Sequence, residues 1–241
     1  MVSIEIVDNP QKAHQLADVL ASVWGDSQAV SADVIIAVAH AGGYASIAQT
    51  TLNGEVKTVG GSLGIVGRND EKLHSHVTGV VSNATNNHVG RELKQHQWAW
   101  AKHHGLSAIS WTFDPLVRRN AHFNLISLGA KVVAYHQDFY GELSDALNAG
   151  DSTDRLVVER QVVGLETAPV GKTTQAQSDE ILIATPEDIV AMRQKGTVEN
   201  QKDSRQWRTD QRKQFETAFG SSHFVRGFTA DGSFVLRKEN A

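Results

Sequence analysis

Cysteine is missing from this 241-residue sequence. The chain therefore has no disulfide, no thiol nucleophile and no thiolate metal site. It also has no apolar run near the roughly 20 residues that a membrane-spanning helix needs. The first residues lack the basic-then-apolar pattern of a secretion signal, because Glu5, Asp8 and Pro10 interrupt it. These absences predict a cytoplasmic protein that does not enter a membrane.

A large excess of charge of either sign is also missing, since the formal net charge is −4. This small negative charge gives no reason to expect nucleic acid or an anionic membrane as a partner. The apolar share of 40% and the charged share of 21% are typical of a soluble globular protein. A chain of this length can bury a full hydrophobic core.

Hydrophobic periodicity and turn residues predict that strands and helices are mixed along the chain. Asn53-Gly54 and Asp231-Gly232 are strong signals for hairpin turns. The expected strands are 2–7, 44–52, 56–66, 76–81, 106–113, 131–140, 155–163, 180–184, 224–228 and 233–237. The expected helices are 10–24, 31–41, 91–104, 118–130, 186–195 and 204–219.

The composition changes after the strand at 155–163. The segment that follows is rich in Thr, Gln, Gly and Ala, which is typical of a long loop or linker. We therefore expect a main domain over residues 1–163, a linker over 164–179 and an extension over 180–241. Homodimers are common among soluble proteins, so a homodimer is the prior expectation.

The stretch over residues 73–130 is the best candidate for the functional site. A strand at 76–81 leads through a turn at 82–90 into a helix that begins near Arg91. The first amides of a helix have no acceptor inside the helix, and they point at an anion that approaches along its axis. This arrangement predicts that a phosphorylated ligand binds where the helix begins.

Two stretches resemble the GNAT acyltransferase superfamily, and the resemblance covers roughly residues 1–163. Residues 79–90, Gly-Val-Val-Ser-Asn-Ala-Thr-Asn-Asn-His-Val-Gly, fall where that family has its coenzyme A loop. Residues 111–116, Trp-Thr-Phe-Asp-Pro-Leu, followed by Arg119-Asn120-Ala121 and Leu128-Gly129-Ala130, resemble its second motif region. Together with Leu-His-Ser-His at 73–76, the Trp-Thr-Phe-Asp-Pro-Leu stretch is similar to one branch of GNAT proteins, some of which look like N-acyltransferases acting on amino acids.

The resemblance implies an α/β (α+β) fold with a mixed, mostly antiparallel central sheet flanked by helices, here with a C-terminal α+β extension. It implies an N-acyltransferase that uses acetyl-CoA or another acyl-CoA as co-substrate, with direct attack in a ternary complex. The acceptor would be the amine of a small molecule, for which an amino acid is one candidate. The coenzyme-binding positions that follow are Val80, Val81, His88, Val89, Gly90, Arg91 and Asn120.

The sequence departs from the family pattern at three positions. Thr85 stands where an Arg or Gln is expected, and His88 replaces the first glycine of the coenzyme loop. That glycine lets backbone amides approach a pyrophosphate without an intervening side chain. Leu125 occupies the place of the tyrosine that often serves as general acid. Tyr140, expected at the end of a strand, is the remaining candidate to donate that proton.

Acyl transfer to an amine requires a neutral amine, a polarised carbonyl and a stabilised or protonated thiolate. His74 and His76 share a face if their segment is extended, and imidazole titrates near neutrality. They are candidates to accept the amine proton or orient the acceptor, with two hydrogen-bonded polar residues at a strand entrance as the alternative. Asp114 is a candidate to receive an ammonium group or act as a base, or it caps the following turn.

Two other functions stay open at this point. One is a catalytically degenerate GNAT-fold protein that binds acyl-CoA or a partner without turnover. The other is a metal-dependent hydrolase using His74 and His76, but a metal would need a third ligand and no carboxylate lies in obvious register, so we expect no metal. Lys94 and Arg118 are expected on solvated helix faces, whereas Arg91 and Arg119 are expected to approach the phosphates.

Overall fold

The computed structural model describes residues 2–24, 30–52, 54–67, 71–82, 84, 88–141 and 152–239. The chain forms two compact units. Unit 1 consists of Met1–Trp111 and Gln161–Ala168, and unit 2 of Thr112–Arg160 and Pro169–Ala241. The expected division of the chain at residues 163 and 179 stays a prediction.

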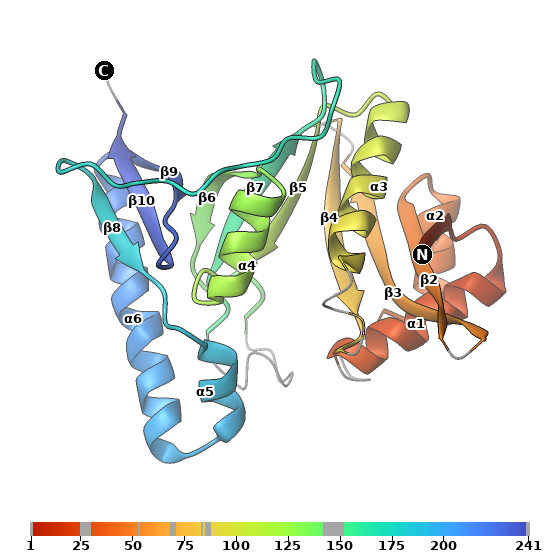
Figure 1. The fold of residues 1–241 in the computed structure, drawn as a ribbon, viewed down its shortest axis with the longest axis horizontal. Helices are drawn as coiled ribbons and strands as arrows, with labels where there is room; N and C mark the ends of the chain where they lie inside the picture. Colours follow the sequence, from red (N-terminus) through yellow and green to blue (C-terminus); the bar gives the residue numbers. More distant parts are fainter. Residues whose placement is uncertain are drawn as a thin grey trace. The chain divides into compact units, whose positions relative to one another are not determined.

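Unit 1 is built on a twisted sheet in which the strands follow the order β1-β2-β3-β4-β5 (Figure 1). The pairs β1–β2, β2–β3 and β3–β4 are antiparallel, whereas β4 and β5 are parallel. The elements are β1 (Ser3–Ile6), α1 (Pro10–Trp24), α2 (Ala32–His40), β2 (Tyr44–Leu52), β3 (Glu55–Val66), β4 (Lys72–Val80), α3 (Val89–His103) and β5 (Ala108–Phe113), the last of which continues into unit 2.

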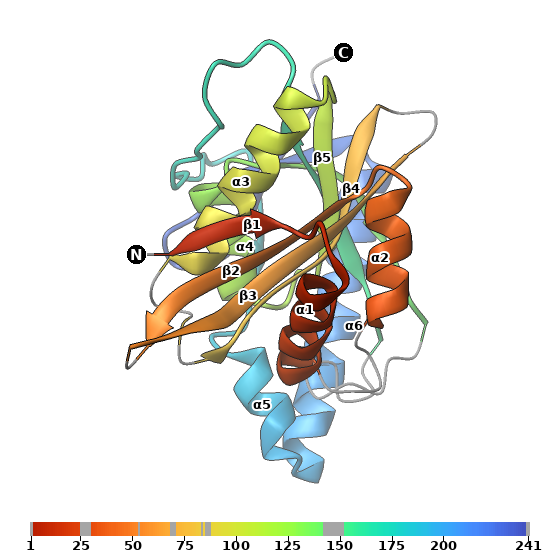
Figure 2. The same ribbon diagram turned by 90° about the vertical axis from the view of Figure 1, so that its right-hand side faces the viewer.

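Helices α1 and α3 cover opposite faces of this sheet. Successive residues of a strand point to opposite faces, and two neighbouring glycines of β3 show which helix lies on each side. A Cβ at Gly60 would lie 3.3 Å from Cδ1 of Leu93 on α3, and one at Gly61 would lie 2.2 Å from Cδ1 of Leu16 on α1. Figure 2 shows α1 beside the strands β2 and β3. The glycines of β3 therefore allow close packing of both helices.

The sequence of α1 explains its packing. Its apolar residues recur at three- and four-residue spacing and form one buried stripe, Ala13, Leu16, Val19 and Leu20. They pack with Ile35 of α2 and with Ala45, Ile47 and Leu63 of the sheet. On the other face, Val89 and Leu93 of α3 pack with Ala48 and Val59. The sheet is thus sandwiched between apolar helix faces.

Unit 2 contains a pair of antiparallel strands and a small three-stranded sheet. Strands β6 (Lys131–His136) and β7 (Arg155–Gln161) are antiparallel, and the small sheet has the order β8-β10-β9. Its remaining elements are α4 (Arg118–His122), a π-helical turn (Phe123–Ser127), β8 (Ile181–Ala184), α5 (Ile189–Lys195), α6 (Val198–Gly220), β9 (His223–Phe228) and β10 (Ser233–Lys238). Figure 1 shows α6 running beside the small sheet.

The predicted fold class is confirmed: helices flank a mixed, largely antiparallel sheet, and an α+β extension follows. The hairpin at Asp231-Gly232 also forms, with Gly232 at a φ of 93°. The predicted strand 131–140 is wrong beyond His136, because Asp138 takes a left-handed conformation and its N–H donates to Asp154. Among the described helices, none combines the length and the apolar character needed to cross a bilayer.

Helix α6 begins earlier than the predicted residue 204. Thr197 caps it, and the Thr197 hydroxyl accepts a hydrogen bond of 3.2 Å from the N–H of Asn200. This is the ordinary role of Thr at an N-cap, where it satisfies a helix amide that has no internal acceptor. The charged sequence of its first turns hides the helix from a search for apolar periodicity.

Candidate functional site

The turn after β4 leads directly into α3, as the sequence predicts. His88 is the residue before the helix, and its φ of 59° and ψ of 8° are left-handed. The first hydrogen bond inside the helix joins the N–H of Glu92 to the carbonyl oxygen of His88 at 3.0 Å. Helix geometry therefore leaves the amides of Val89, Gly90 and Arg91 at the start of α3 without acceptors inside the helix. Such amides suit an anion.

Among the described residues at this helix start, no side chain caps the helix. His88 is exposed, and its side chain makes no capping hydrogen bond. Val89 points into the core, Gly90 adds no side chain and Arg91 is exposed. His88 thus takes the conformation that glycine favours, and its imidazole does not cap the helix. Thr85 lies outside the described residues.

Strands β4 and β5 pair only over a short distance before they part. The parallel register runs from Lys72–Ala108 through Leu73–Ile109 to His74–Ser110. β4 continues to Val80, so its second half extends beyond the last pair with β5. This half of β4 lies between the last pair and the turn that leads to α3.

Just after β4, the main chain of Val81 forms hydrogen bonds both to β3 and to the turn that leads to α3. The N–H of Val81 donates to the carbonyl oxygen of Val59 at 2.9 Å, and the Val81 carbonyl accepts from the N–H of Ala84. Hydrogen bonding alternates along an antiparallel pair, so the main chain of Val80 is directed away from β3. Of the two predicted cofactor-binding valines, Val80 has the main chain that faces the open side.

A β-bulge interrupts the pairing of β3 and β4 at the candidate catalytic histidines. Leu63 pairs with Val77 and the next residue, Gly64, pairs with Ser75, so His76 is the extra residue of β4. The extra residue of a bulge has no opposite partner in the ladder, and bulges re-aim local groups. The bulge therefore changes the direction of the main chain at His76.

His74 and His76 lie close together, which agrees with the expected shared face. Their ring centroids are 6.3 Å apart. Desolvation lowers the pKa of His74, and the charges of His76 and Lys94 lower it further. Desolvation also lowers the pKa of His76, although that residue is exposed. These shifts favour the neutral form of both imidazoles near pH 7, which is the form that accepts a proton.

The structure corrects the expectation for Lys94. Its side chain is 6% exposed, and its Nζ donates to the hydroxyl of Ser75 at 2.7 Å and to Oε1 of Gln97 at 3.3 Å. Its neighbours along α3 explain this burial: Leu93 is the preceding residue and Gln97 follows one turn later on the buried stripe. The helical spacing in the sequence could have indicated it.

The structure argues against Asp114 as a base. Its carboxylate accepts hydrogen bonds from Arg208 at 3.0 and 2.7 Å, from Arg193 at 3.0 Å and from the N–H of Leu116 at 2.9 Å. Burial alone would raise the pKa of Asp114, but the two guanidinium groups lower it well below its usual range. A base with so low a pKa removes protons poorly near pH 7. These contacts favour a structural role within unit 2.

Tyr140 and Asn120 also lie in unit 2. Tyr140 lies in a turn after β6 rather than at a strand end; its hydroxyl is 3.1 Å from Oγ1 of Thr112, and the Arg155 guanidinium lies 5.5 Å from its ring centroid. Asn120 lies in α4, where its N–H donates to the carbonyl of Val117. The described part of each unit thus holds its own share of the predicted site residues.

The basic residues of α4 border a cavity of about 360 Å³ in unit 2. Nε of Arg118 donates to the hydroxyl of Thr185 at 2.9 Å, so this side chain is fixed rather than solvated. Arg119 and His122 are exposed. The cavity residues are Arg118, Arg119, His122, Glu187, Phe228, Ala230 and Gly232.

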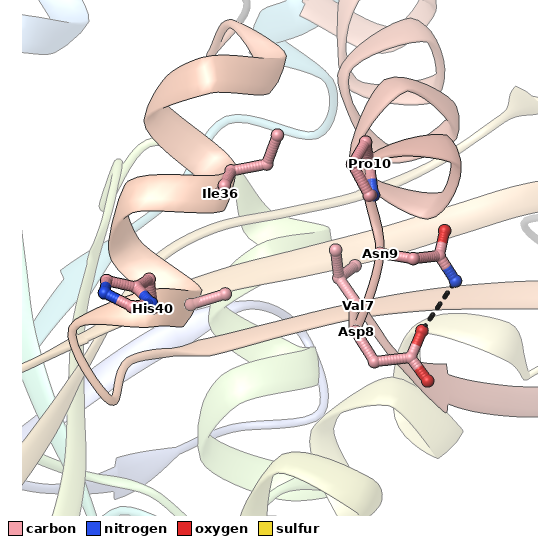
Figure 3. Close-up of a pocket in the computed structure, with 7 residues that line it drawn as sticks. Val7, Asp8, Asn9, Pro10, Ile36 and His40 are labelled. Carbon is pink, nitrogen blue, oxygen red and sulfur yellow. Dashed lines mark hydrogen bonds between the residues drawn. The ribbon is translucent and has the colours of Figure 1, made fainter.

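Unit 1 has a smaller cavity, of about 270 Å³, between the start of α1 and the end of α2. Figure 3 shows Asn9 pointing toward Asp8, and its Nδ2 donates to Oδ1 of Asp8 at 2.7 Å. The carboxylate of Asp8 also pairs with Lys12 at 3.1 Å, and this contact lowers the pKa of Asp8. Its charge is already balanced, so we place no catalytic step there.

The described residues contain no group of three or more His, Cys, Asp or Glu side chains that could hold a metal ion. His74 and His76 are thus a pair without a third such ligand within that described part.

Comparison with known proteins identifies the fold. No protein-family model matches the sequence, and neither does any curated protein. Solved structures do match, among them a ribosomal-protein alanine N-acetyltransferase from Escherichia coli, with a TM-score of 0.52 and 11% identity over 73% of this chain and 99% of that one. A GNAT-family acetyltransferase from Streptococcus pneumoniae has a TM-score of 0.53 and 14% identity over 67% and 99% of the two chains.

A third similar structure is a Bacillus subtilis acetyltransferase in complex with CoA, with a TM-score of 0.50 and 15% identity over 68% of this chain and 100% of that one. These likenesses show that the chain has the GNAT acetyltransferase fold. The alignments cover almost all of each of those proteins, so the rest of this chain is additional to the fold they share.

Proposed function

We propose that this protein is an acyl-CoA-dependent N-acyltransferase that acts on the amine of a small molecule. The observation that carries the proposal is the end of the β4–β5 pairing at His74–Ser110, which leaves the second half of β4 between this last pair and the turn that leads to α3. The outward main chain of Val80 and the first amides of α3, which have no acceptor inside the helix, then follow one another along the chain. A thioester with a diphosphate tail offers matching groups for both.

The helix start supports binding of the coenzyme. Its diphosphate would accept hydrogen bonds from the amides of Val89, Gly90 and Arg91, where the helix dipole also favours negative charge. The Arg91 guanidinium, which is exposed, can add a bidentate contact to a phosphate. The amide-containing arm would pair with the outward main chain of Val80, as an added strand does.

The bulge and the neutral histidines support acyl transfer. The amine nitrogen would attack the thioester carbonyl carbon, the C–S bond would break, and the amine would lose a proton. The main-chain N–H of His76 is a candidate donor to the oxygen on which negative charge develops. Neutral His74 is a candidate to accept the amine proton. Leu125 is buried and carries no proton to donate, and a role of Tyr140 in returning a proton to the thiolate stays a prediction from the sequence.

Isothermal titration with acetyl-CoA and succinyl-CoA tests the proposal. We expect one of them to bind, and Arg91→Gln to weaken that binding about tenfold because a charge-assisted hydrogen bond is lost. Lys57→Gln is the matched control, since Lys57 is an exposed cation on β3. Failure of both thioesters to bind would remove the proposal.

The absence of an ionisable group at Leu125 favours one alternative, a GNAT-fold protein that binds acyl-CoA without turnover. A panel of amines, assayed for release of free thiol from the bound thioester, separates the two functions. Release of thiol that depends on an amine selects the enzyme, whereas binding without release selects the alternative. Homodimerisation and a cytoplasmic location stay predictions from the sequence.

A further inference from the structure

Lys94 is a buried lysine of unit 1. Its ammonium group contacts three elements: the hydroxyl of Ser75 on β4 at 2.7 Å, Oε1 of Gln97 on α3 at 3.3 Å, and the ring of Trp111 on β5 with 4.3 Å to the centroid. A lysine is rarely buried unless its charge is well satisfied. A hydroxyl, an amide oxygen and an aromatic face each stabilise a cation.

The residues that Lys94 contacts on the two strands are those at which the strands part. The last parallel pair is His74–Ser110, and Ser75 and Trp111 are the next residue of each strand. The ammonium group therefore lies where β4 and β5 cease to be neighbours in the ladder. A flexible four-carbon stem lets Lys94 reach this point from α3.

The hydrogen bonds continue from Lys94 to the far side of the β4 bulge. Nε2 of Gln97 donates to the hydroxyl of Ser62 at 3.2 Å, and that hydroxyl donates to the carbonyl oxygen of Val77 at 3.2 Å. The hydroxyl of Thr78 completes the chain at 2.8 Å from that of Ser62. Ser75 and Val77 are the neighbours of His76, so the network holds the bulge from both sides.

We propose that Lys94 is a positioning residue for acyl transfer, which fixes the point where β4 and β5 part and, through Ser75, Gln97 and Ser62, the main-chain N–H of His76. This inference rests on the proposed function and deepens it. A buried network that is fully hydrogen-bonded resists distortion. The reacting groups are sensitive to small displacements, since a shift of 1 Å can cost about 10²-fold in rate.

The charge of Lys94 gives the proposal a readout that does not need catalysis. The positive charges that act on His74 are those of His76 on β4 and Lys94 on α3, and both lower the pKa of His74. The residues paired with His74 on β3 and β5 are Ile65 and Ser110, neither of which titrates. Removal of the Lys94 charge should therefore raise the midpoint of the His74 titration.

The experiment compares Lys94→Met with Lys102→Met in the full chain. Lys102 is a matched control, because it lies on the same helix with its Nζ 5.4 Å from the centroid of Trp98, but it is exposed. We measure the His74 titration by NMR, and the ratio of the dissociation constants for CoA and acetyl-CoA by calorimetry. Ser75→Ala, which keeps the charge, serves as a second variant with a milder effect on folding.

We expect Lys94→Met to raise the midpoint of the His74 titration. We also expect it to reduce the preference for acetyl-CoA over CoA about tenfold, because the main-chain N–H of His76 is no longer held in place to donate to the acetyl carbonyl. Binding of CoA itself should persist, since the proposed place of its diphosphate is the start of α3, away from Ser75 and Trp111. Ser75→Ala should reduce the preference without moving the titration. Lys102→Met should change neither quantity.

Two results would overturn the inference. One is an unchanged ratio in a folded Lys94→Met protein, whatever happens to its titration, and the other is an equal change of the ratio in the Lys102→Met control. If the wild-type protein binds neither CoA nor acetyl-CoA, the proposed function fails instead, while the titration still decides whether the Lys94 charge acts on His74.

Discussion

The guanidinium of Arg208 donates to both oxygens of the Asp114 carboxylate, at 3.0 Å to Oδ1 and 2.7 Å to Oδ2. Arg193 adds a third contact of 3.0 Å, and all of these side chains are buried. Asp114 lies directly after β5, whereas the arginines come from α5 and α6. The ion pairs of Asp114 thus link the helices α5 and α6 to the segment that follows β5 within unit 2.

Asp114→Asn should destabilise the protein strongly. The change leaves two buried guanidinium groups without their counter-charge, which costs about 3–5 kcal/mol for a buried pair. Urea unfolding at pH 7, followed by circular dichroism, measures the loss. Asp203→Asn is the matched control, because Asp203 is an exposed acid of α6, and a loss of similar size in both variants would contradict a specific role for the pair.

The same pair predicts an acid-sensitive stability. The folded-state pKa of Asp114 is lowered by the arginines, so its contribution is fully present above the unfolded-state pKa of about 3.9 and is lost as the pH falls below it. The free energy of unfolding should therefore fall more steeply for the wild type than for Asp114→Asn between about pH 4 and pH 2. Parallel curves would show that other acids control the loss.

The third prediction concerns packing in unit 2. A Cβ at Gly171 would lie 2.1 Å from the carbonyl oxygen of Leu125, which is backbone and cannot turn aside. Gly171→Ala should destabilise the protein by about 1–3 kcal/mol, the usual cost of overpacking. Gly220 provides the control, since a Cβ there meets nothing within 4 Å. Equal thermal stability of the two alanine variants would contradict this account.

Local sequence patterns predicted the elements whose signals are local. The turn at Asp231-Gly232, the strand before α3 and the shared face of His74 and His76 depend on neighbours within a few residues. The resemblance predicted the fold class, which the similar structures bear out. The coenzyme-binding and catalytic roles of individual residues stay predictions.

Local sequence patterns could not predict contacts between residues that are far apart in the sequence. Asp114 and Arg208 are 94 positions apart, and no periodicity links a turn residue with one particular arginine of a later helix. The burial of Lys94 depends on which side of α3 meets the sheet, and on the bulge at His76 that brings Ser75 to that side. Charge alone suggested a solvated face, whereas tertiary packing decided otherwise.

The left-handed conformation of His88 leads to a prediction about the helix start. A side chain at this φ costs roughly 1–2 kcal/mol, which glycine avoids, while glycine also loses more freedom on folding. We expect His88→Gly to be about 0.5–1 kcal/mol more stable than His88→Ala, which removes the imidazole and keeps the strained backbone. Thermal unfolding of both variants measures this difference. Equal stabilities would show that His88 leaves this conformation in solution.

The last prediction concerns the pH dependence of the reaction. Because desolvation and nearby charges lower the pKa of His74, the proton-accepting form persists below the ordinary value of about 6.5. With an amine that supports turnover, kcat/KM should rise with pH through a midpoint below about 6.5 and then level off. His74→Gln should remove this limb and slow the reaction at least about 10²-fold, whereas the exposed His14→Gln should keep it. If the rise of kcat/KM with pH survives in His74→Gln, the titration belongs to another group. His76 would then be the first residue to replace, because its ring is close to that of His74 and desolvation lowers its pKa as well.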